Sequence, residues 1–469
     1  MGEQIRIRGN LFAALWALAL VAAALQAQPF LSGYRLTADE ILFHYLSLKN
    51  TLAQNVQFIS ETAAQQGRVG QFIILPINIL VSDVAAVPWA RIGFLGAWGG
   101  LMLLTALWVG RLCRSKAFAV LSFLMLVTYQ RLGFDHMPPN SYPLQNTVPF
   151  LLILASRLAG GSQRSLVTNC TLSAVLCLSM VTSEYAWVFG LGVVGCEYLA
   201  NFSRGKEEGL ARLKSRGFAL DVTAIAIALA IYLGYRFVHP SHYESNSPDG
   251  IWNLSALAWT SFFHVLNGTV LLPIQWVHFA QAPWKALAAW AGMSLLTAAV
   301  AWGAFRSLER DRPWLIIAVV GLLFSLYMTL PVAITVRHQT WCAMAWPCAY
   351  LDTRSAFPGL AVALVAMCGW LLRFGRIMQV VLAITLGLGS GTTYLYNLWF
   401  SQEMNKAAKA WERADALACQ PPSSLPEGEA LLKAVDPRGS ISVHPNFPHA
   451  DYWRIYIESR RADCTGSAP

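Results

Sequence analysis

Long apolar stretches separated by short polar segments recur along residues 11–400 of the chain. Many of them approach the roughly 20 consecutive apolar residues that a helix needs to cross a bilayer. The weak alternation of apolar and polar residues that marks membrane-spanning strands is not visible. The pattern therefore predicts an all-α polytopic membrane protein with about 11 transmembrane helices.

The basic residues in the connections orient these helices, because cytoplasmic loops of membrane proteins carry an excess of Lys and Arg. Arg6 and Arg8 precede the first apolar stretch and place the N-terminus in the cytoplasm. An even number of crossings must separate the later basic clusters, so residues 69–87 are expected to lie along the outer face. The predicted spans are residues 10–28, 91–110, 117–133, 146–159, 166–182, 186–201, 217–237, 285–304, 314–331, 356–372 and 377–399. Residues 261–280 and 340–350 could each add one span, which gives a range of 11–13.

This topology places the long connections on the extracytoplasmic face, where the function is therefore expected. Residues 1–400 would form the transmembrane domain, and its first outer loop, residues 29–90, carries an amphipathic pattern typical of helices that lie on a membrane surface. Residues 401–469 would form a small extracytoplasmic C-terminal tail.

The composition agrees with a membrane protein, since 56% of the residues are hydrophobic and only 13% are charged. A soluble globular protein carries roughly 25% charged residues. The formal charge of +9 does not indicate nucleic-acid binding, because the basic residues gather in short loops between apolar stretches. We expect an integral, multi-pass protein of a bacterial inner membrane, with the lipid bilayer and not nucleic acid as its partner.

Nine cysteines divide into two groups. Seven lie in or beside apolar stretches, where cysteine packs as a small hydrophobic residue: Cys113, Cys170, Cys177, Cys196, Cys342, Cys348 and Cys368. Cys419 and Cys464 lie in the polar tail and could form a disulfide if the tail is outside the cytoplasm.

The stretch "YRLTADEILFHYL" at residues 34–46 places two adjacent carboxylates beside the predicted membrane surface. Thr37 and Glu40 have the spacing of a capping box, which accounts for Glu40. Asp39 would gain only a modest benefit from the helix dipole, well under ~1 kcal/mol, so the helix start alone does not account for it. His44 falls one turn beyond Glu40 on the same helix face.

A short first span, an outer loop that opens with an acidic residue, and amphipathic helices before the second span resemble the GT-C superfamily of integral-membrane glycosyltransferases. Protein O-mannosyltransferases and lipid A aminoarabinose transferase belong to this superfamily. The resemblance covers the topology of roughly residues 1–250. It implies an inverting transfer of sugar from a polyprenyl-phosphate-linked donor to a glycan, lipid or protein acceptor on the extracytoplasmic face.

The resemblance also implies roles for the two carboxylates. Asp39 would act as the general base on the acceptor hydroxyl, and Glu40 would support it. The chain lacks the WWDYG motif of oligosaccharyltransferases and a paired-acid signature for a divalent metal in this loop. We therefore expect metal-independent chemistry without a cofactor, although the sequence leaves a divalent metal open.

A phosphate leaving group calls for cations on the outer face. The available residues are Arg68, Arg91, Arg131, Arg337 and His338. The superfamily often places a phosphate-binding basic residue near a late outer loop, which favours Arg337. The alternative for Arg337 is an arginine at a helix end whose charged group reaches the interface.

For three further residues the sequence allows either a functional or an ordinary structural role. Glu184 lies in a very short turn between two apolar stretches, and it is either a second functional acid or a turn residue. Asp135 and His136 lie in an outer loop rich in Pro and Asn and present the same choice.

Two other functions remain open from the sequence. A flippase or transporter of lipid-linked sugars is one, although its polar residues would be expected within the spans and at broken helices. An O-antigen polymerase or ligase is the other, and Arg337 with His338 would suit it. Asp39 separates the two enzymes, because only the glycosyltransferase should depend on it.

Overall fold

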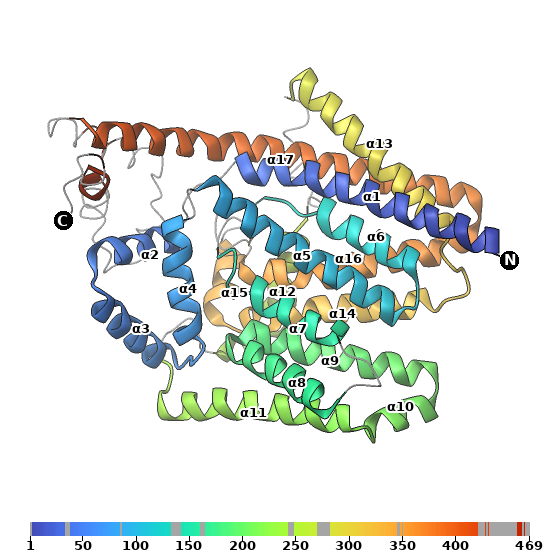
Figure 1. Cartoon of the computed structure of the whole chain (residues 1–469), viewed down its shortest axis with the longest axis horizontal. Coiled ribbons are helices and arrows are strands. Elements are labelled where there is room, and N and C mark those ends of the chain that lie inside the picture. The colour runs from blue at the N-terminus through green and yellow to red at the C-terminus, as the bar shows by residue number, and fades with distance from the viewer. Residues whose placement is uncertain are drawn as a thin grey trace.

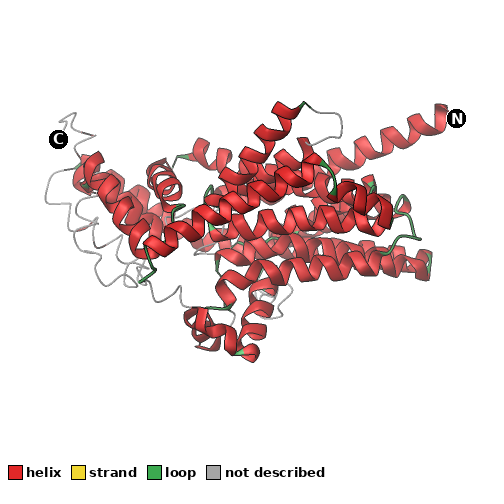
Figure 2. Cartoon of the chain, turned by 90° about the horizontal axis from the view of Figure 1, so that it is seen from below, coloured by secondary structure: helices red, strands yellow, loops and turns green. Residues whose placement is uncertain are grey.

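The computed structural model describes residues 2–32, 38–84, 87–132, 142–159, 165–242, 248–269, 282–344, 348, 350–420, 427, 430, 457–461 and 464. These residues form helices, turns and loops without a strand, which confirms the all-α prediction for this part of the chain (Figure 2). Thr37, Asp135 and His136 lie outside the described residues, and for Asp39 only the backbone is described.

Seven helices of the described part are long and apolar enough to cross a membrane. They are α1 (Gly2–Ser32), α5 (Pro88–Leu112), α11 (Arg216–Val238), α13 (Trp284–Arg306), α14 (Trp314–Ala333), α16 (Leu351–Leu371) and α17 (Arg376–Ala418). Their length and composition indicate an integral membrane protein.

Four further helices coincide with predicted spans. They are α6 (Lys116–Thr128), α7 (Thr147–Ala159), α8 (Leu166–Val181) and α9 (Glu184–Arg204). The first three have 13, 13 and 16 residues, fewer than the roughly 20 that a straight crossing needs. The count of about 11 spans therefore stays a prediction.

The remaining helices are short and lie in the connections. They are α2 (Ala38–Lys49), α3 (Leu52–Gln66), α4 (Gln71–Val84), α10 (Lys206–Leu213), α12 (Leu254–Leu266) and α15 (Val336–Met344). Two of them fall on the segments that could have added spans. With 13 and 9 residues, α12 and α15 are each too short for a crossing of their own.

The long helices run roughly along one axis of the molecule, with the N-terminus at one end and the group α2–α4 at the other (Figure 1). The longest helix, α17, has 43 residues and runs through position 400 without a break. The tail predicted to begin at residue 401 thus continues directly from the last apolar helix.

Helices α14 and α16 approach each other through two glycines. A Cβ atom added to Gly359 would lie 2.5 Å from the carbonyl oxygen of Gly321, and one added to Gly321 would lie 2.8 Å from that of Gly359. Both distances are too short for a real contact. Small residues at such a crossing let two membrane helices pack backbone to backbone, because the lipid supplies no hydrophobic driving force between them.

A buried ionic cluster joins α7, α9 and α11. Arg157 donates from Nη1 to Asp221 Oδ1 over 2.6 Å and from Nε to Glu197 Oε2 over 2.9 Å. Trp108 of α5 donates to the other oxygen of Glu197, and Tyr198 donates to Asp221. Charges away from water are tolerated when they are paired in this way, so the cluster fixes how these helices face each other.

Replacing Gly359 with Val should disrupt the contact between α14 and α16, because the new side chain would meet backbone atoms of α14 that cannot move aside. We expect a loss of about 1–3 kcal/mol in the free energy of unfolding, typical of overpacking. Thermal unfolding of the detergent-purified protein measures it. Gly292→Ala in α13 is the matched control, since nothing lies within 4 Å of its added Cβ. Equal melting temperatures for the two variants would contradict the close contact.

Candidate functional site

A cavity of about 620 Å³ lies between the group α2–α4 and the adjoining ends of the bundle helices. Its lining includes residues of α2, α3 and α4 on one side and residues from the starts of α9 and α16 and the end of α11 on the other. Small-molecule sites usually have volumes of roughly 300–1,000 Å³. The cavity is therefore large enough for a substrate, and its lining comes from segments far apart in the sequence, from Leu42 to Leu351.

The connection between α3 and α4 attaches this group to the bundle. At Gly70 an added Cβ would lie 1.9 Å from the carbonyl oxygen of Thr182, so the two backbones are in direct contact. Gly67 ends α3 in the left-handed conformation, with a φ of +63°, which glycine adopts without strain. The backbone of His242 donates to the carbonyl of Gln65 over 2.9 Å. Two contacts and a tight turn at Gly67 thus hold this part of the chain against the end of the bundle.

An ion pair lies where this connection meets α9. Arg68 donates from Nε to Glu184 Oε1 over 2.6 Å, and the two side chains are 30% and 23% exposed. Ser183 caps α9 by accepting from the backbone of Ala186, which places Glu184 in the first turn of the helix. A carboxylate is favoured there by the helix dipole as well as by Arg68.

The pair changes the protonation equilibria of both groups. Burial alone would raise the pKa of Glu184, but the Arg68 guanidinium, together with hydrogen bonds from the backbone and from Tyr232, holds this pKa below its ordinary value of 4.5. Burial would lower the pKa of Arg68, and the Glu184 carboxylate raises it above its ordinary value instead. Both groups are therefore charged at neutral pH.

Further polar side chains, and the cation Arg236, extend the pair in two directions. Tyr232 of α11 donates to Glu184 Oε1 over 2.8 Å, and Arg236 donates to the Tyr232 hydroxyl over 3.1 Å. On the other side, Gln66 Oε1 accepts from Arg68 and from Gln71. The network thus joins α3, α4, α9 and α11 around one wall of the cavity.

The rest of the lining is largely apolar on the side of the first loop. Residues of α2, α3 and α4 supply it: Leu42, Phe43, Leu46, Phe58, Ile74 and Leu75. The cavity lining therefore combines a charged and hydrogen-bonding network with apolar side chains. An amphipathic ligand matches such a lining better than a wholly polar one.

Comparisons with protein-family models, with curated proteins and with solved structures found no match to this chain. Its function must therefore be argued from the site.

The structure brings two of the predicted site residues together, namely Arg68 and Glu184. The sequence presented both as candidates but did not indicate that they pair. His44 lies close to the cavity but bonds away from it, since its Nδ1 lies 3.1 Å from Asp83 Oδ1 of α4. Ser47 donates to the same carboxylate oxygen. His44 and Asp83 thus hold α2 against α4.

The other predicted cations are not among the described residues that line the cavity. Arg131 donates to the backbone and side-chain oxygens of Asn267 and to Tyr396. Arg337 lies over the ring of Trp341, with 5.5 Å between the guanidinium carbon and the ring centroid. Each of these two arginines therefore contacts a residue outside the cavity lining.

His338 is buried, and its ring centroid lies 4.6 Å from that of Tyr350, which does line the cavity. Its Nδ1 lies 2.7 Å from the hydroxyl of Thr335. His338 thus supports the cavity wall from behind.

The carboxylate pair of the first loop is described only in part. Helix α2 begins at Ala38, so Asp39 and Glu40 lie in its first turn. The Glu40 side chain is buried, with 2% exposed. The proposed capping residue Thr37 lies outside the described residues, as do Asp135 and His136.

Several lining residues were missed from the sequence. Tyr232 lies near the end of an apolar helix, where a tyrosine is ordinarily an interfacial anchor. Gln66 and Gln71 flank a connection that showed no motif. The sequence did show a polar residue at a predicted helix end beside a short loop. This pattern is common in membrane proteins, so it does not by itself indicate a residue that lines a cavity.

Both cysteine interpretations can be compared with the structure. Cys419 and Cys464 form the disulfide that the sequence allowed. Cys342 and Cys348, expected to pack as small hydrophobic residues, instead form a second disulfide. His264 lies beside them, and these three are the residues of the described part grouped closely enough to hold a metal ion.

A double-mutant cycle on Arg68→Gln and Glu184→Gln should show that the ion pair stabilises the fold. Each single change leaves one charge in a partly buried site, and we expect a loss of roughly 1–3 kcal/mol with a coupling free energy of at least ~0.5 kcal/mol. Chemical denaturation in detergent measures both quantities. The pair Glu309–Arg312, whose glutamate side chain is 63% exposed and whose N–O distance is 2.7 Å, is the control and should give a coupling near ~0.3–0.5 kcal/mol. A coupling at Arg68–Glu184 no larger than the control would contradict this role.

The depressed pKa of Glu184 predicts a pH dependence. The folded state holds the carboxylate charged, so its contribution to stability is complete above the ordinary pKa of 4.5 and is lost as the pH falls through the lower pKa of the folded state. The melting temperature should fall on acidification from about pH 5 to about pH 3. The melting temperature of the Glu184→Gln variant should fall less steeply over this interval, because glutamine has no proton to gain at this position. If the melting temperatures of wild type and variant fall in parallel, Glu184 titrates at its ordinary pKa.

Proposed function

We propose that this protein is a membrane glycosyltransferase that moves a sugar from a polyprenyl-phosphate-linked donor to a glycan, lipid or protein acceptor on the extracytoplasmic face. The mixed lining of the cavity is the observation that supports this proposal most directly. A lipid-linked sugar phosphate has an isoprenoid chain, a charged phosphate and a hydroxyl-rich sugar. The apolar side chains suit the chain, and the network around Arg68 suits the phosphate and the sugar.

The proposal includes a topology of 11 crossings with the N-terminus in the cytoplasm. The turns α5–α6, α13–α14 and α16–α17 lie at the same end of the molecule as the N-terminus (Figure 1). These turns contain Arg111, Arg114, Arg310, Arg312 and Arg373, as cytoplasmic loops do. Both disulfides belong to connections or helix ends at the opposite end, as an oxidising compartment requires. The cavity would then open toward the periplasm.

Asp39 is proposed as the catalytic base. It precedes Leu42 by three residues and Phe43 by four, and both of these line the cavity. Positions with this spacing share one face of a helix. Glu40 lies next to it in the same turn and supports it.

In the proposed reaction, Asp39 accepts the proton of the acceptor hydroxyl as its oxygen bonds to the anomeric carbon of the donor sugar. The bond between that carbon and the phosphate oxygen breaks, and the polyprenyl phosphate leaves with the electron pair. The configuration at the anomeric carbon inverts. Arg68 stabilises the charge on the departing phosphate, and Glu184 keeps Arg68 oriented. No step requires a metal ion.

Complementation with Asp39→Asn tests this proposal. We expect deletion of the gene to remove one sugar increment from the mass profile of surface glycans and glycolipids, and the wild-type gene to restore it. Asp39→Asn should fail to restore it at matched expression, because a general base contributes typically 10²–10⁴-fold to the rate. Glu61→Gln on α3 is the matched control and should restore it, since Glu61 is exposed and bonds only to Gln57 in the described part.

Full restoration of the profile by Asp39→Asn would overturn the assignment of the base. If the deletion changes glycan chain length instead of removing one increment, a polymerase or ligase that depends on Arg337 and His338 explains the phenotype better. If lipid-linked sugar accumulates on the cytoplasmic side after the deletion, a flippase explains the phenotype better.

A further inference from the structure

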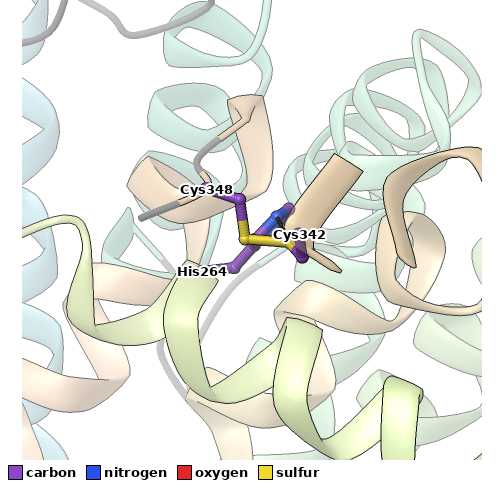
Figure 3. A group of neighbouring side chains, drawn as sticks. All are labelled: His264, Cys342 and Cys348. Atoms are coloured by element: carbon purple, nitrogen blue, oxygen red, sulfur yellow. Dashed lines mark hydrogen bonds between the residues drawn. A yellow bond between two sulfur atoms is a disulfide. The ribbon is translucent and has the colours of Figure 1, made fainter. Parts of the chain in front are cut away.

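Three side chains from three separate segments meet in a cluster outside the cavity (Figure 3). His264 belongs to α12, Cys342 belongs to α15, and Cys348 precedes α16. One ligand atom from each, the histidine nitrogen and the two sulfurs, lies within 4.8 Å of the others. The three side chains are buried, and the two sulfurs form a disulfide.

A buried carboxylate orients the histidine of this cluster. Asp352, in the first turn of α16, accepts from His264 Nδ1 over 2.7 Å and is wholly buried. A proton held on Nδ1 by the carboxylate leaves the lone pair on Nε2. That nitrogen lies 3.4 Å from Cys342 Sγ, so the lone pair faces the disulfide.

We propose that reduction of the Cys342–Cys348 disulfide converts this cluster into a binding site for a soft divalent metal ion such as zinc. A dithiol or phosphine supplies two electrons, and the two sulfurs take up two protons as the S–S bond breaks. Binding of the metal ion releases these protons, because thiolates are the ligands. The ligands are Cys342 Sγ, Cys348 Sγ and His264 Nε2, and the fourth zinc position is left for water.

Two features of the cluster fit a metal site better than a chance encounter. The contact Asp352–His264 reproduces the arrangement in which a carboxylate fixes the tautomer of a zinc-bound histidine. The 3.4 Å between His264 Nε2 and Cys342 Sγ also suits two ligands of one tetrahedral ion, since Zn–S is ~2.3 Å and Zn–N is about 2.0–2.1 Å, and reduction frees the two sulfurs to separate around the ion. The set of two sulfurs and one imidazole favours zinc over magnesium or calcium.

Metal binding and disulfide formation compete for the same two sulfurs. Either state ties α12 and α15 to the start of α16, so the cluster can hold this part of the fold in reducing and in oxidising surroundings. This inference does not depend on the glycosyltransferase proposal, and its test does not measure activity.

Metal titration of the purified full-length protein tests it. The metal-free protein is kept oxidised or reduced with a phosphine, mixed with Zn²⁺, and freed of unbound metal by gel filtration before elemental analysis. We expect about one zinc per chain in the reduced protein and none in the oxidised protein. Co²⁺ in place of Zn²⁺ should give the visible and sulfur-to-metal absorption bands of a tetrahedral thiolate site.

Matched variants separate this site from the other thiols. Cys342→Ser with Cys348→Ser should lose the zinc, although Cys113, Cys170, Cys177, Cys196 and Cys368 remain. Cys419→Ser with Cys464→Ser should keep it. Asp352→Asn should weaken zinc binding about 10–100-fold and leave the two thiols in place.

The proposal is overturned if the reduced wild type and the Cys342→Ser/Cys348→Ser variant bind equal amounts of zinc, or if the oxidised protein binds as much as the reduced one. Should the double serine variant fail to fold, His264→Gln serves instead, because it keeps both thiols but removes the imidazole. Retention of tetrahedral cobalt bands in His264→Gln would also overturn the proposal.

Discussion

The ion pair between Arg68 and Glu184 is the interaction on which the arrangement of the cavity depends. It joins the connection between α3 and α4 to the first turn of α9, two segments separated by 116 residues along the chain. Residues of α2 and α4, among them Phe43 and Ile79, also belong to the main hydrophobic core, but hydrophobic contacts are not directional. A charged pair that also receives a hydrogen bond from Tyr232 supplies a directional contact, and it fixes both walls of the cavity at once.

The same principle recurs elsewhere in the molecule. Arg157 pairs with Glu197 and Asp221 inside the bundle, and His264 contacts Asp352 at the start of α16. Each pair links helices that are distant in sequence. Removing one partner would leave an unpaired charge in surroundings with little water, which would destabilise the fold. Elsewhere the helices approach through small residues, as Gly321 and Gly359 do. Ionic contacts therefore set which helices meet, and small residues set how closely.

The sequence predicted the helices well because a run of apolar residues is a local property. A helix lies in each of the 11 predicted ranges, although α6 ends at Thr128, short of residue 133, and the turns α5–α6, α13–α14 and α16–α17 lie at a common end (Figure 1). The site was predicted less well, because pairing is a property of the fold. Arg68 and Glu184 were each candidates, yet nothing local indicated their partnership. Cys342 and Cys348 lie in apolar surroundings, which suggested packing, and only the fold shows that their sulfurs meet.

The two sites meet at the start of α16. Tyr350 and Leu351 line the cavity, and Cys348 and Asp352 on either side of them belong to the cluster with His264. Because Cys348 is bonded to Cys342 of α15 and Asp352 contacts His264 of α12, Tyr350 and Leu351 are held from both directions. The start of α16 is thus held by a covalent bond and a hydrogen bond, while the α3–α4 connection and the start of α9 are held together by the ion pair at Arg68. A helix group at the edge of a bundle can form a defined cavity only if the segments that line it are fixed, and here each of these segments has its own attachment.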